Sequence, residues 1–147
     1  DVEVDLVDIV ELDLPHRHPG GPNEAVRRHD ERISRADAFV VVTPEYNHSF
    51  PAGLKHAIDV VHGGWARKPV GFVSYGGISG GLRSAQELRQ LIGNLGMVPV
   101  PGVVPVPFHW EKIENGKLVV NEPMEQGLAG LFSDSPRLER ASGDLIR

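Results

Sequence analysis

The chain has 147 residues, of which 40% are hydrophobic and 24% charged, a balance that permits a packed core and excludes global disorder. Its net charge of −5, with basic residues scattered along the chain, argues against nucleic acid as a partner, because binding phosphates takes clustered Lys and Arg. The absence of cysteine excludes disulfides, thiolate metal sites and a cysteine nucleophile, and no apolar stretch approaches the ~18 residues of a membrane span. We therefore expect one cytoplasmic domain, residues 1–147, without nucleic acid or membrane as a partner.

The first part of the chain predicts strand, helix, strand and helix in turn. Residues 2–9 alternate apolar and acidic side chains, which is typical of a strand near a sheet edge. Asn23 can cap a short helix that runs to about Ser34. Residues 38–42 are a continuous apolar run, typical of a parallel strand buried on both faces, and a helix is expected from about Pro51.

The middle of the chain contains its clearest helix. Residues 70–74 predict another buried strand, and the glycine-rich loop 75–81 follows it directly. Apolar residues then recur at three- and four-residue spacing over 82–95, and Gly96 is suited to end that helix. This segment therefore predicts a strand, a loop that approaches other groups closely, and an amphipathic helix.

The last part predicts a strand region, a hairpin and a helix. Residues 98–106 form the strand region, interrupted by three prolines, and Asn115-Gly116 is a signature of a tight hairpin turn. A final helix is expected to begin near Glu122. Alternation of strands and helices along the whole chain implies an open parallel sheet with helices on both faces.

Two unusual loops follow buried strands, and ligands of open α/β sheets bind at such strand ends. The first, residues 43–51, reads Thr-Pro-Glu-Tyr-Asn-His-Ser-Phe-Pro and combines a rigid proline with carboxylate, phenol, amide and imidazole groups. Polar residues before a helix are also routine caps, so this loop alone decides little. The second, residues 74–81, has four glycines, which let a backbone approach a ligand closely.

The second loop also contains a rival motif. Residues 77–81 read Gly-Ile-Ser-Gly-Gly and match the nucleophile elbow G-x-S-x-G, with Ser79 as the nucleophile of an acyl hydrolase. The acid and the histidine of a triad should follow in that order. His109 is the only histidine after Ser79, and Glu87 is expected on the outer face of the long helix. The motif keeps a serine hydrolase as an alternative, although the residues that follow Ser79 offer no clear acid for a triad.

Together the two loops resemble those of the NADPH-dependent FMN reductase family. Residues 43–49 resemble its T-P-E-Y-N-x-S segment, and residues 71–83 resemble its second flavin loop. The resemblance implies an α/β, flavodoxin-like, doubly wound parallel sheet of five strands in the order 2-1-3-4-5. It implies FMN and NADPH as cofactors, a small-molecule electron acceptor such as a flavin or a quinone, and a homodimer or homotetramer. The cofactor-binding residues that it implies are Pro44, Glu45, Tyr46, Asn47, Ser74, Gly76, Gly77 and Gly80.

The resemblance also implies a strand and a phosphate-binding loop ahead of the first residues. Neither is present in this sequence, and residues 2–9 would then be the second strand of the sheet. We expect about thirty to forty upstream residues, the size of one βα unit, to complete the sheet. A flavodoxin-like electron carrier that binds FMN without NADPH activity is the other alternative.

Overall fold

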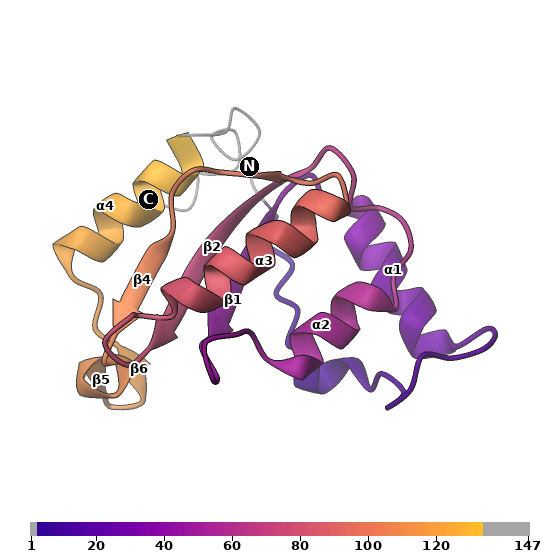
Figure 1. The fold of residues 1–147 in the computed structure, drawn as a ribbon, viewed down its shortest axis with the longest axis horizontal. Coiled ribbons are helices and arrows are strands. Elements are labelled where there is room, and N and C mark those ends of the chain that lie inside the picture. Colours follow the sequence, from indigo (N-terminus) through magenta and orange to yellow (C-terminus); the bar gives the residue numbers. More distant parts are fainter. Residues whose placement is uncertain (1–2, 134–147) are drawn as a thin grey trace.

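The centre of the fold is a four-stranded parallel sheet, seen in a computed structural model that describes residues 3–133 (Figure 1). Strand β2 pairs with β1 along one side and with β3 and β4 along the other. The strands are β1 (Phe39–Pro44), β2 (Pro69–Gly76), β3 (Val98–Pro99) and β4 (Val104–Pro107). The parallel arrangement predicted from the alternation of elements is therefore confirmed.

Helices cover the two faces of this sheet, as predicted. They are α1 (Glu24–Arg35), α2 (Ala52–Asp59), α3 (Leu82–Asn94) and α4 (Glu122–Ser133). Side chains of β2 alternate between two cores: Val70 and Phe72 are fully buried among residues of α1, α2 and α3, whereas Val73 packs against the core that contains α4. The two layers of helices thus hold β2 in the middle of the domain.

Local sequence explains where the helices begin and end. The Asn23 side chain accepts a hydrogen bond from the Val26 N–H at 3.1 Å and caps α1, as predicted. Gly96 has a positive φ of 70° just beyond the end of α3, a conformation that suits glycine after a helix. The predicted helices therefore have the expected starts and stops to within a few residues.

The segment predicted as a first strand is not a strand. Residues 3–8 lack regular structure, and a short 3₁₀ helix, Ile9–Leu12, follows them. Leu6 is 84% exposed, and Asp5 forms an ion pair with Arg32 that holds the segment beside α1. A strand needs a neighbour to satisfy its backbone groups, and β2 is the only strand of the described residues that pairs with β1.

Two further expectations need correction. Strand β1 is not buried on both faces, because α4 packs against β4 and β2 and leaves Val42 63% exposed. The strand region 98–106 is divided into β3 and β4. Proline lacks the N–H that a ladder needs, and Arg89 instead donates to the carbonyl groups of residues 100–102 between the two strands.

The C-terminal part follows the prediction. Strands β5 (Ile113–Glu114) and β6 (Lys117–Leu118) form an antiparallel hairpin, in which Asn115 and Gly116 both have positive φ. The predicted last helix is α4, and the polar tail beyond it lies outside the described residues. Between residues 3 and 133, no helix combines the length and the apolarity needed to cross a membrane.

Candidate functional site

The two loops singled out in the sequence lie next to each other at one edge of the sheet. Thr43 is in register with Ser74 and Pro44 with Tyr75, so both strands end at the same level. The Glu45 N–H donates to the Tyr75 carbonyl oxygen at 3.0 Å and continues the ladder into the loops. The structure therefore brings together the two segments that sequence reasoning assigned to one site.

The first loop is a tight turn. Tyr46 and Ser49 exchange two backbone hydrogen bonds of 2.9 Å each. The two residues between them, Asn47 and His48, both have positive φ, which is the pattern of a type I′ turn and a conformation that Asn tolerates well. This turn leaves the Tyr46 side chain 62% exposed at the loop edge, where it is available to a planar ligand.

Glycines of the second loop have two different roles. A Cβ atom on Gly81 would lie 2.6 Å from the Tyr75 nitrogen, and one on Gly80 would lie 2.9 Å from the Pro105 Cβ; both residues also have positive φ. A Cβ atom on Gly77 would meet nothing closer than Trp110, at 4.0 Å. The fold itself therefore requires glycine at 80 and 81, whereas position 77 has space beside it.

Ser74 shapes the second loop from inside. Its side chain is fully buried, and its hydroxyl donates to the Gly80 carbonyl oxygen at 2.9 Å. The hydroxyl is thus engaged within the protein, and Ser74 fixes the loop that follows β2. A direct contact between Ser74 and a cofactor stays a prediction.

Glu45 connects the first loop to the second. Its carboxylate accepts hydrogen bonds from the Ser79 hydroxyl at 2.8 Å, the Arg83 N–H at 3.1 Å and the Arg83 guanidinium at 2.7 Å. The Glu45 side chain is 8% exposed and that of Arg83 48%. Burial raises the pKa of Glu45, but the hydrogen bonds from Arg83 and Ser79 outweigh it and hold that pKa below its usual value.

The Ser79 hydrolase alternative finds no support in this geometry. The Ser79 hydroxyl donates to Glu45, and no histidine of the described residues bonds to it. His109 packs instead against the Tyr75 ring, with 4.9 Å between ring centroids. Glu87, the one carboxylate between Ser79 and His109 in the sequence, accepts a hydrogen bond from the Ser49 hydroxyl of the first loop.

Sequence reasoning missed an aromatic wall formed by Phe108 and Trp110. The Phe108 N–H donates to the Gly76 carbonyl oxygen at 2.9 Å, which attaches this wall to the second loop. Phe108 has a positive φ of 49°, and Trp110 is 56% exposed with its ring edge nearest Gly77. These residues follow β4 and lie far from the loops in sequence, so no local pattern indicated them.

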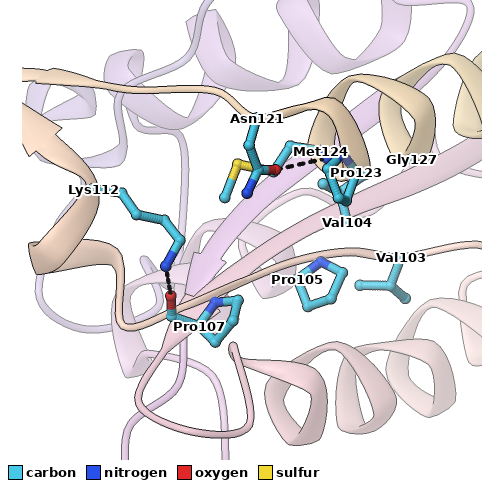
Figure 2. Close-up of a pocket in the computed structure, with 9 residues that line it drawn as sticks. All are labelled: Val103, Val104, Pro105, Pro107, Lys112, Asn121, Pro123, Met124 and Gly127. Carbon is cyan, nitrogen blue, oxygen red and sulfur yellow. Dashed lines mark hydrogen bonds between the residues drawn. The ribbon is translucent and has the colours of Figure 1, made fainter.

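Two hollows lie near the carboxyl ends of the strands. An open one of about 350 Å³ is lined by His48 and the first turns of α3, beside the contact between Glu45 and Arg83. A more enclosed one of about 300 Å³ lies on the α4 side, where Lys112 donates to the Pro107 carbonyl oxygen (Figure 2). The second is lined by Val103, Val104, Pro105, Pro107, Lys112, Asn121, Pro123, Met124 and Gly127. Most of its lining belongs to β4 and α4, and none of it belongs to the two loops.

No group of three or more possible metal ligands occurs among residues 3–133. The arrangement at the sheet edge instead offers a rigid turn with an exposed phenol, a glycine with space beside it and an aromatic wall. Such a surface suits a flat organic ligand.

Comparison with known proteins decides the family. Residues 1–111, which include both loops, match the family model described as NADPH-dependent FMN reductase. The chain belongs to this family. An NAD(P)H-dependent FMN reductase of Schizosaccharomyces pombe is 41% identical over 85 residues, which are 58% of this chain and 42% of that protein. An FMN-dependent NADPH-azoreductase of Staphylococcus haemolyticus is 28% identical over 146 residues, 91% of this chain and 76% of that protein.

The fold of this chain is also similar to that of a solved structure. The flavoenzyme NAD(P)H:(acceptor) oxidoreductase FerB of Paracoccus denitrificans matches with a TM-score of 0.69 and 27% identity, over 89% of this chain and 79% of that one. A probable NADPH:quinone oxidoreductase of rice is 40% identical over 97 residues, 61% of this chain and 49% of that protein. The chain spans about half the length of the first curated relatives that it matches.

Proposed function

We propose that the protein is an FMN-dependent oxidoreductase that takes a hydride from NADPH and passes it to a small acceptor. The observation that carries this proposal is the pairing of two loops at the adjacent ends of β1 and β2, with space beside Gly77. This position is where open α/β sheets bind their ligands. Relatives named as NAD(P)H-dependent FMN reductases, and one named as an FMN-dependent NADPH-azoreductase, support the same cofactors.

The described residues suit one side and one edge of a flat ring system. Pro44 and the turn of Tyr46 and Asn47 would hold it from the first loop, and the backbone at Gly76 and Gly77 would approach it from the second. The chemistry that bound FMN supplies is hydride transfer between a nicotinamide and an acceptor. The protein groups have the tasks of orienting the ring and shielding it from water, and no described side chain is required as a nucleophile.

The acceptor is proposed to be a small planar molecule, such as a quinone or a free flavin. Relatives named quinone reductases in Pseudomonas putida and Escherichia coli support this class. The exposed ring of Trp110 beside the second loop suits stacking with a planar acceptor.

We also propose a five-stranded sheet in the order 2-1-3-4-5, in which a further strand pairs with β1. Among the described residues β1 pairs with β2 alone, and this supports the proposal because a strand edge without a partner invites pairing. Protection of the β1 amides from hydrogen exchange in the full-length protein, equal to that of β2, is the expected result.

Self-association is also a proposal, and the apolar side chains beside the first loop contribute little exposed surface to it. Phe50 and Leu54 pack against the core that contains α2, so they are engaged within the domain. Tyr46 stays exposed and is the aromatic residue of that region available to a second copy. A dimeric or tetrameric mass at micromolar concentration is expected.

The test of the proposed function is steady-state oxidation of NADPH by the full-length protein loaded with FMN, with and without a quinone. We expect NADPH oxidation that depends on both FMN and acceptor. Bound FMN with no NADPH oxidation would favour an electron carrier instead. Ester hydrolysis that disappears in Ser79→Ala, with no NADPH oxidation in the parent, would favour the hydrolase.

A further inference from the structure

Helix α3 lacks a cap of its own. Its N-cap residue is Gly81, which has no side chain to bond the free N–H groups of the first turn. The Arg83 N–H in that turn donates instead to Glu45, a residue 38 positions earlier in the chain. A carboxylate at a helix N-terminus also interacts favourably with the helix dipole. Glu45 therefore caps α3 from a different loop.

Glu45 holds the second loop and the start of α3 through both its side chain and its main chain. The Ser79 hydroxyl donates to the oxygen that caps the helix, and the Arg83 guanidinium donates to the other oxygen. The Glu45 N–H is bonded to the Tyr75 carbonyl oxygen, so main chain and side chain hold the two ends of loop 75–81. With its side chain 8% exposed, Glu45 presents little surface to a ligand.

Glu45 also lies within a rigid assembly. A Cβ atom on Gly76 would lie 3.5 Å from the Glu45 Cβ and 3.3 Å from the Gly81 nitrogen, so these backbones are in close contact. At the far end of the first loop, Ser49 donates to Glu87 of α3 and ties the turn to the same helix. The spacing between the turn at Tyr46 and the backbone at Gly77 is therefore set through α3.

We infer that Glu45 is a positioning residue, which holds the two loops at the separation that the flavin ring needs without itself touching the ring. This inference rests on the proposed function. It assigns to Glu45 the role of a bridge between the loops, and it makes Arg83 and Ser79 the partners through which that role is exercised.

The test compares Glu45→Ala, Arg83→Ala and the double variant with the parent, with Glu24→Gln as a matched control. Glu24 also pairs its carboxylate with an arginine, Arg27, but this pair is exposed on α1 and belongs to neither loop. FMN affinity is measured by titration of the full-length apo-protein, and exchange of the Arg83 amide is measured by NMR without flavin.

We expect Glu45→Ala to weaken FMN binding at least tenfold and to speed exchange of the Arg83 amide. Arg83→Ala should weaken FMN binding in the same direction, and the double variant should be within twofold of Glu45→Ala. Glu24→Gln should match the parent in both measurements. If Glu45→Ala does not fold, the isosteric Glu45→Gln should still show faster exchange and weaker FMN binding.

Three results would overturn the inference. FMN affinity within twofold of the parent in a folded Glu45 variant would leave the residue a purely structural role. Loss of affinity in Glu45→Ala with none in Arg83→Ala would indicate that Glu45 contacts the cofactor directly. Exchange of the Arg83 amide that is unchanged in the Glu45 variants would show that Glu45 does not cap α3. A parent that binds no FMN would instead refute the proposed function, and this inference with it.

Discussion

Replacing single glycines of loop 75–81 should separate binding from folding. An alanine at position 81 would have to keep the φ of +84° that Gly81 has, and its Cβ atom would lie 2.6 Å from the Tyr75 nitrogen. The left-handed backbone costs about 1–2 kcal/mol, and the forced shift of a packed backbone adds about 1–3 kcal/mol. Gly81→Ala should therefore lower the free energy of unfolding by roughly 2–5 kcal/mol. At Gly77 the same methyl group meets only Trp110, at 4.0 Å.

Gly77→Ala should therefore change the stability of the apo-protein by less than about 1 kcal/mol. Its methyl group would occupy the space in which we place the flavin edge, and FMN affinity should fall about tenfold, or ~1.4 kcal/mol. The assay is thermal or urea unfolding of the apo-proteins together with FMN titration of each variant. Unchanged FMN affinity in Gly77→Ala would refute the assignment of this loop, and equal destabilisation by both variants would refute the distinction between the two glycines.

Three further outcomes are expected. Ser79→Ala should keep NADPH oxidation within tenfold of the parent, because hydride transfer needs no nucleophile and both hydrogen bonds from Arg83 to the Glu45 carboxylate remain; complete loss of NADPH oxidation would contradict this. His29 is 3% exposed, and burial lowers its pKa in the native state. As the pH falls, His29 is therefore protonated in the unfolded chain before it is protonated in the native state. Stability should fall as the pH drops below ~6.5, and His29→Gln should reduce that slope in denaturant titrations; a pH-independent difference between the two proteins would contradict the reasoning. Asn23→Ala should destabilise the domain by about 1 kcal/mol in the same titrations through loss of the α1 cap, and no change would show that water replaces it.

Sequence reasoning singled out the two adjacent loops because their signals are local. Each loop directly follows an apolar strand, and parallel strands that pair in register bring such loops together. The turn of Tyr46 to Ser49 and the hairpin at Asn115-Gly116 likewise depend on residues adjacent in the chain. Patterns of this length are visible in a single sequence.

What the sequence did not indicate depends on distant partners. Residues 3–8 have the alternation of a strand, but a strand forms only beside another strand, and no pattern states whether that neighbour is present. The link between Glu45 and Arg83 joins residues 38 positions apart, and only the fold brings them together. The difference between Gly77 and Gly81 arises from the atoms packed around them rather than from their places in a glycine-rich run.

The most direct test of the central claim is FMN titration of the full-length apo-protein, followed by absorbance of the bound flavin and quenching of its fluorescence. The account predicts saturable binding of one FMN per chain, weakened in Gly77→Ala and unaffected in Glu24→Gln. A folded protein that neither quenches FMN fluorescence nor retains flavin after gel filtration would contradict it.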